Sequence, residues 1–331
     1  MTAIRHNNAL DRSRYSVIYS YVVASPKHIQ TLRVECGSVN FSRYASYLNG
    51  TMSVGWLIDG DMFPHYRDDL VAAIQSHGHT AKLVHAPSPP FRWDDVGCSY
   101  RETFHSDHCV VSHGDIELVS KIHNEQRWRP GAFATIENYY CSNYVNHFGE
   151  FWLNRDYLML PFGDLRRQKQ LLFDTFGFDG RIFARPDSPL KLFTGQTASY
   201  GTFDADVEYM GFYEFPNRSL VVVSSPKIVE REWRFVAANQ DIVAGCLYCE
   251  NGQFESKPQI DDDAKQLAQK IASYGYAPDP VWIVDICQTS DGEYHLLEIG
   301  GFSFADLYNC NKSDIVDAVS DVALSLWRND A

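Results

Sequence analysis

The sequence lacks the features that would place it in a membrane or on nucleic acid. No apolar run reaches the roughly 18 residues that a membrane-spanning helix needs. Lysine and arginine number 29 against 42 aspartate and glutamate residues, which gives a formal net charge of −13. Since a nucleic-acid-binding face is usually basic, this balance argues against such a partner. We therefore expect no membrane partner and no nucleic-acid partner.

Cysteine patterns typical of zinc or disulfide-exchange sites are also missing. The eight cysteines are scattered, and only Cys246 and Cys249 lie close together. They fall in an expected strand, where positions i and i+3 point to opposite faces. No second C-x-x-C pair is present to complete a zinc site. The pattern is typical of reduced thiols in a cytoplasmic protein.

Two common nucleotide-binding signatures, GxGxxG and GxxxxGK, do not occur, and no convincing Ser-His-Asp or Cys-His set stands out. What the sequence does contain is 45% hydrophobic and 14% aromatic residues. This composition indicates a folded globular protein. With 331 residues, the chain is long enough for two or three domains.

The amino-terminal segment differs from the rest. Residues 1–51 show no clear periodicity apart from a short apolar run at 15–24. We interpret them as a disordered or mis-started extension and expect a protein beginning at Met52 to keep its stability. The apolar run is the exception, because it could add an edge strand or a docking helix.

From Met52 onward the pattern alternates between strands and helices. Strands are predicted at 54–58, 81–85 and 109–112, with a helix at 68–77. This alternation predicts a small α/β domain over residues 52–125. Further on, aromatic residues between 130 and 178 are expected in the core. Later elements are a strand at 220–223, a hairpin at 232–248, and helices at 261–275 and 313–327.

A hairpin near the carboxyl terminus carries the clearest chemical signal. Strand-like runs at 281–287 and 293–299 flank Ser290-Asp291-Gly292. Asp-Gly between apolar runs favours a two-residue loop. That loop places Thr289 opposite Tyr294 and Asp285 opposite Glu298.

Asp285 and Glu298 stand among apolar neighbours, so their charges need compensation. Opposed side chains on one sheet face lie about 5 Å apart at Cβ, and like charges there destabilise the sheet. A divalent ion with oxygen ligands, Mg²⁺ or Mn²⁺, would resolve the repulsion. Two alternatives remain open: one acid faces solvent, or a lysine or arginine neutralises the pair.

The order of these elements resembles the ATP-grasp superfamily, in particular the clade marked by one arginine and two lysines. The matching stretches are FARPDSPLKLFTGQ, VVVSSPKIVEREWRFVAANQDIVAG and VWIVDICQTSDGEYHLLEIGGFSFADLY. The resemblance implies a mixed α+β and α/β architecture in which two α+β subdomains grip ATP. The ATP-grasp domain would span 126–331, and 52–125 would be the pre-ATP-grasp α/β domain.

The resemblance also implies roles for individual residues. Asp285 and Glu298 would hold Mg²⁺ (or Mn²⁺). Arg234 would reach the phosphates or a substrate carboxylate, and Lys191, on a mobile loop, would close over the γ-phosphate; these two would be catalytic. The remaining contacts to ATP would come from Arg185 on the α- or β-phosphate, from Val223 and Ser224 around adenine, and from Lys227 and Glu232.

The implied activity is an ATP- and Mg-dependent ligase that joins a carboxylate to an amine through an acylphosphate. Its substrates would be small molecules or peptides, and the sequence indicates no oligomeric state. One departure is Gly300, which stands where the superfamily often has a metal-binding asparagine. A phosphotransferase, a nucleotide-binding module without turnover and a metal-dependent nuclease are the alternatives, although the acidic composition argues against the nuclease.

Overall fold

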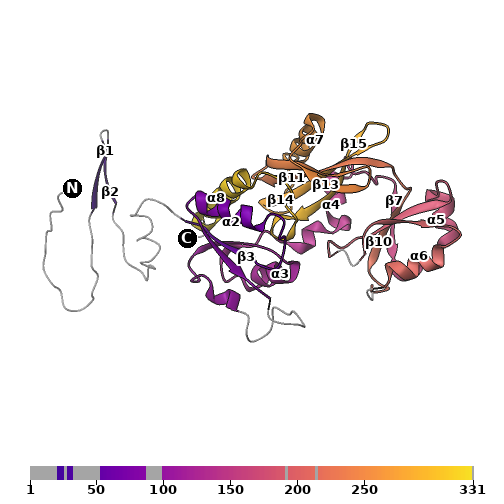
Figure 1. Ribbon diagram of the computed structural model, residues 1–331, viewed down its shortest axis with the longest axis horizontal. Coiled ribbons are helices and arrows are strands. Elements are labelled where there is room, and N and C mark those ends of the chain that lie inside the picture. Colours follow the sequence, from indigo (N-terminus) through magenta and orange to yellow (C-terminus); the bar gives the residue numbers. More distant parts are fainter. Residues whose placement is uncertain are drawn as a thin grey trace. The chain divides into compact units, whose positions relative to one another are not determined.

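The computed structural model describes residues 21–25, 28–32, 53–86, 99–190, 193–212 and 215–329 (Figure 1). The chain divides into two compact units, Met1–Met52 and Ser53–Ala331. In the first unit, β1 (Tyr21–Ser25) and β2 (His28–Leu32) form an antiparallel hairpin. The rest of the predicted extension lies outside the described residues, so its disorder stays a prediction.

A four-stranded parallel sheet opens the second unit. Its order is β4 (Thr80–Val84), β3 (Gly55–Asp59), β5 (Cys109–His113) and β6 (Arg129–Gly131). All residues of β3 and β5 are buried, as expected for central strands of a parallel sheet. The helices α2 (Arg67–Ser76) and α3 (Ile116–Glu125) belong to this layer, as does the short η1 (Ser99–Glu102). The predicted α/β pattern from Met52 is confirmed.

The second sheet is small and antiparallel. Its order is β7 (Tyr157–Pro161), β10 (Leu220–Ser224), β8 (Arg181–Pro186) and β9 (Gln196–Ser199). The helices α5 (Lys169–Phe176) and α6 (Phe203–Met210) pack on it through Leu172, Phe203 and Val207 (Figure 1). Val221 and Val223 of β10 join that core, whereas Val222 packs into the core of the next sheet. Alternation along β10 therefore connects two hydrophobic cores.

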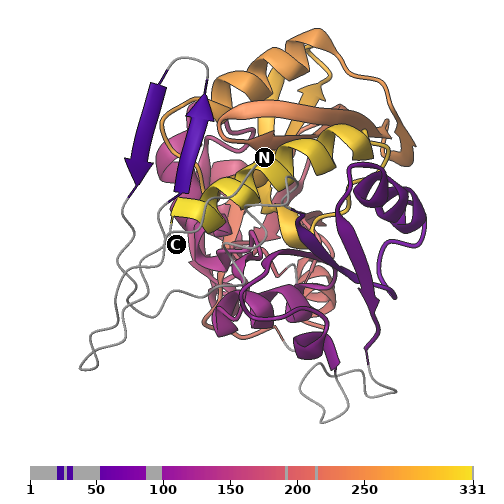
Figure 2. The same ribbon diagram turned by 90° about the vertical axis from the view of Figure 1, so that its left-hand side faces the viewer.

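The third sheet has five antiparallel strands. Its order is β13 (Gln253–Lys257), β12 (Asp241–Glu250), β11 (Val229–Ala238), β14 (Val281–Thr289) and β15 (Tyr294–Gly301). The helix α7 (Asp262–Ala272) begins after Asp261, whose carboxylate accepts hydrogen bonds from the backbone N–H groups of Asp263 and Ala264. Its apolar side packs against Trp233 and Phe235. The closing helix α8 (Lys312–Asn329) contacts both this sheet and the parallel sheet, and so lies between them (Figure 2).

The predicted aromatic core is confirmed. Phe148, Phe151 and Trp152, around the end of α4 (Cys141–Phe148), are buried in the core of the five-stranded sheet. Three short helical turns complete this part of the chain: η2 (Ile136–Tyr139), η3 (Phe162–Asp164) and η4 (Phe302–Phe304). None of the helices in the described ranges is both long and apolar enough to span a membrane.

The β14–β15 hairpin differs from its prediction in one respect. Its loop has three residues, since the Thr289 N–H donates to the Glu293 carbonyl over 3.0 Å and the Gly292 N–H to the Thr289 carbonyl over 2.8 Å. Gly292 has φ of +85°, as expected for the last position of such a loop. Tyr294 therefore pairs with Gln288, and the predicted pairing with Thr289 is wrong.

The register recovers further along the hairpin. A bulge between the pairs Ile286–Leu296 and Asp285–Glu298 adds one residue, Leu297, to β15. The Leu297 carbonyl accepts a hydrogen bond from the indole Nε1 of Trp152 over 3.2 Å. Asp285 thus pairs with Glu298 as predicted, although the loop length and the bulge behind that pairing were not anticipated.

Candidate active site

The small sheet and the five-stranded sheet meet at an ion pair. Arg185 lies on β8, and its Nη2 donates to Oε2 of Glu298 on β15 over 2.8 Å. Its Nη1 lies 3.5 Å from the Leu297 carbonyl oxygen of the bulge. Burial opposes the charge of Arg185, but its neighbours Cys141, Tyr144 and Glu298 raise its pKa above the ordinary value. The contact joins the small sheet to the five-stranded sheet through an ion pair in which Arg185 remains positively charged.

A second ion pair lies within the five-stranded sheet. Arg234 on β11 is the direct neighbour of Asp285 on β14. The guanidinium bonds both carboxylate oxygens, with Nε to Oδ1 at 2.9 Å and Nη2 to Oδ2 at 2.6 Å. Nη1 donates to the Asp306 carbonyl over 2.8 Å. Both side chains are buried, and the ion pair outweighs the effect of burial, so the pKa of Arg234 is raised well above its ordinary value.

These contacts address the alternatives left open for the acid pair. Asp285 and Glu298 are cross-strand partners, and each carboxylate binds one arginine. The alternative in which an arginine neutralises the acids is therefore what the structure shows. Carboxylate oxygens remain suitable donors for a divalent cation, and guanidinium groups suit phosphate oxygens. The site offers both kinds of group side by side.

Two tyrosines that the sequence analysis did not identify support Arg234. Its guanidinium carbon lies 5.4 Å from the ring centroid of Tyr248 and 4.9 Å from that of Tyr308. The two rings are stacked, with centroids 5.0 Å apart. Tyr248 could have been found from the alternation of β12, whereas Tyr308 follows the last strand and has no periodic signal.

Glu232 belongs to the same group. The Tyr248 hydroxyl donates to Glu232 Oε2 over 2.6 Å. Burial raises the pKa of Glu232, and the negative charges of Asp285 and Glu298 raise it further. A carboxyl with a raised pKa next to two anions is a candidate proton carrier.

The residues predicted to surround adenine lie at the end of β10. Val223 and Ser224 are fully buried, and the Ser224 hydroxyl donates to Oδ1 of Asn154 over 3.0 Å. Lys227 follows the strand, with Nζ 3.0 Å from the Ser225 carbonyl oxygen, and burial lowers its pKa. Lys191 lies outside the described residues. The structure thus brings Arg185, Arg234 and Glu232 together with the two acids, while Val223 and Ser224 are the last two residues of β10 and Lys227 follows that strand.

Comparison with known proteins identifies the fold. Three similar solved structures are D-cycloserine synthetase DcsG, a RimK domain ATP-grasp protein from Sphaerobacter thermophilus, and N5-carboxyaminoimidazole synthase from Aspergillus clavatus. The first shares 13% identity over 82% of this chain and 100% of its own, with a TM-score of 0.57. The second shares 15% over 82% and 99%, and the third 13% over 83% and 77%, each with a TM-score of 0.53. At these identities the likeness shows the fold alone.

A search of the curated proteins finds no match to this sequence. A family model for the ATP-grasp domain, family 2 of the clade marked by one arginine and two lysines, matches residues 168–318. That range contains β8, β11, β14 and β15, which carry both ion pairs. Residues 168–318 therefore form an ATP-grasp domain of the clade with one arginine and two lysines, and the chain as a whole has the ATP-grasp fold.

Proposed function

We propose that this protein is an ATP- and Mg²⁺-dependent ligase that joins a carboxylate to an amine through an acylphosphate. The observation that carries the proposal is the junction of the two sheets, where two cross-strand carboxylates lie between two arginines. Guanidinium groups complement phosphate oxygens, and carboxylates complement Mg²⁺. The family match supports an ATP site at this junction.

The residues present fit ATP and Mg²⁺. Asp285 and Glu298 would hold the metal, while Arg185 and Arg234 would bind phosphate oxygens. Val223 and Ser224 would border adenine, with Lys227 and Glu232 nearby, and Lys191 would close over the γ-phosphate. When bound, ATP would supply the phosphoryl group and Mg²⁺ the charge neutralisation that phosphoryl transfer needs.

The chain would contribute position and electrostatics, with no covalent nucleophile of its own. A substrate carboxylate would take the γ-phosphoryl group, which releases ADP and forms the acylphosphate. The amine would then attack the carbonyl carbon, and phosphate would leave as the amide forms. The guanidinium of Arg234 lies over the rings of Tyr248 and Tyr308, and its pKa is raised. It would therefore remain positively charged while it binds an anion. We place this activity in the cytoplasm, with small-molecule or peptide substrates.

Product analysis tests this proposal. The full chain would be incubated with ATP, Mg²⁺ and a panel of amino acids and short peptides, with and without hydroxylamine. A ligase should release ADP and phosphate together and form a hydroxamate from the accepted carboxylate. Phosphorylated product without hydroxamate would indicate a phosphotransferase instead. Nucleotide binding without ADP release across the panel would indicate a binding module, and either result contradicts the ligase.

Gly300 offers a test of the metal site. A Cβ built there would meet only Cβ of Ile283, at an ordinary distance of 3.8 Å, so a Cβ fits without a clash. Gly300 lies two residues after Glu298, on the same face of β15. We expect Gly300→Asn to lower the Mg²⁺ concentration needed for half-maximal ADP release, because the amide adds an oxygen ligand. Gly300→Ala is the control, and an equal effect of both variants would contradict the explanation.

A further inference from the structure

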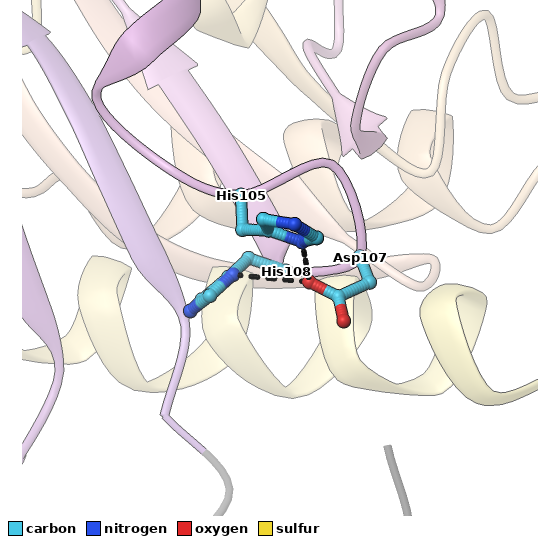
Figure 3. A group of neighbouring side chains, drawn as sticks. All are labelled: His105, Asp107 and His108. Carbon is cyan, nitrogen blue, oxygen red and sulfur yellow. Dashed lines mark hydrogen bonds and ion pairs between the residues drawn. The ribbon is translucent and has the colours of Figure 1, made fainter. Parts of the chain in front are cut away.

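A group of metal-ligating side chains lies outside the candidate active site. His105, Asp107 and His108 occupy the segment just before β5 (Figure 3). Nδ1 of His105 lies 2.6 Å from Asp107 Oδ1, and Nδ1 of His108 lies 3.4 Å from the same oxygen. One ligand atom from each residue lies within 4.8 Å of the others. One ion could contact all three side chains after small rotations.

The backbone of this segment is held in place from two sides. The buried indole of Trp128 donates to the His105 carbonyl over 3.1 Å. The indole of Trp327, on α8, donates to the Asp107 carbonyl over 3.2 Å. A metal site gains affinity when its ligands stand on fixed backbone, because less conformational entropy is lost on binding.

Exposure leaves one side of the group open to water. The Asp107 side chain is only 12% exposed, whereas those of His105 and His108 are 73% and 53% exposed. The carboxylate thus lies on the protein side of the group, and the two imidazoles lie on its solvent side. A water molecule could complete four-coordinate geometry from the solvent side.

We propose that His105, Asp107 and His108 bind a divalent first-row transition metal ion of the zinc class. Two imidazoles and one carboxylate suit Zn²⁺, Co²⁺ or Ni²⁺, whereas Mg²⁺ prefers oxygen ligands alone. The ion would be distinct from the Mg²⁺ assigned to Asp285 and Glu298. Its ligands lie ahead of Cys109, the first residue of β5, and Trp327 ties them to α8. The ion would therefore fix the conformation of the segment before β5, which Trp327 holds against α8, and take no part in chemistry.

The test is a titration with Zn²⁺ of the full chain, from which a chelator has first removed bound metal. The buffer contains excess Mg²⁺, so that any site with oxygen ligands alone is already filled. Isothermal titration should show one bound Zn²⁺ per chain and a higher melting temperature. His105→Ala and His108→Ala should each weaken binding at least about tenfold, because each removes one of three ligands. Since both side chains are exposed, the melting temperature without metal should stay unchanged.

His85→Ala is the matched control. His85 is 61% exposed and also pairs with an aspartate, Asp61, at 2.9 Å. It lies outside the group of three, so its removal should leave Zn²⁺ affinity unaltered. Co²⁺ substitution provides a second readout, with visible bands expected and no thiolate charge-transfer band. Zn²⁺ binding that survives in the His105→Ala/His108→Ala double variant, or no binding by the folded chain, would overturn the proposal and leave Asp107 as a hydrogen-bond acceptor for the two imidazoles.

Discussion

Glu298→Gln and Asp285→Asn are each expected to reduce Mg²⁺-dependent ATP turnover by at least about 10²-fold, the scale of losing one preorganised electrostatic contact. Each change removes a carboxylate charge with little change of volume. The carboxylates are the proposed metal ligands, so added Mg²⁺ should restore only part of the rate. The measurement is ADP release against Mg²⁺ concentration.

The two variants should differ in stability. Asp285→Asn leaves the buried Arg234 without the carboxylate that binds it through two hydrogen bonds. Breaking such a buried ion pair lowers the free energy of unfolding by about 3–5 kcal/mol. Glu298 is less buried than Asp285, and its partner Arg185 also lies near the Leu297 carbonyl, so Glu298→Gln should lower the melting temperature less. Glu293→Gln, at an exposed position directly after the loop of the same hairpin, is the control for both. Normal turnover in the folded Glu298→Gln variant would refute the metal assignment.

Arg185→Ala should weaken ATP binding by roughly 10- to 100-fold while it changes adenosine binding little, because hydrogen bonds to charged groups contribute about 1.5–3 kcal/mol. Lys227→Ala should act in the same direction. Lys191→Ala should affect turnover more than binding, since loop closure excludes water during the reaction. Titration of each variant with ATP and with adenosine separates the binding free energy of the phosphates from that of the adenosine.

Arg181→Ala is a suitable control for Arg185→Ala. Both arginines lie on β8, but Arg181 is exposed and pairs with Asp179 at 3.5 Å. Arg185→Lys should recover part of the ATP affinity, although lysine cannot reproduce the planar guanidinium contact. An equal loss of adenosine and ATP affinity in Arg185→Ala would show that the residue supports the fold of the site and does not bind phosphate.

The acid pair shows how far local patterns reach. The strand-like apolar runs and the Asp-Gly turn between them predicted Asp285 opposite Glu298, and the structure has that pair. The turn was predicted one residue too short, and the error was cancelled by a bulge at Leu297. At that bulge the Leu297 carbonyl accepts the indole N–H of Trp152, which lies 145 residues earlier in the chain. No pattern within the hairpin could have indicated it.

By itself, the sequence determined the order of strands and helices, the buried aromatic segment and the cross-strand position of the two acids. These follow from side-chain periodicity and turn chemistry, which act over a few residues. Only the tertiary structure decided which cation each acid binds. Arg185 and Glu298 are 113 residues apart and meet because Val222 joins the small sheet to the core of the larger one. Tyr308 meets Arg234 in the same way, through packing of distant segments whose contacts no local period encodes.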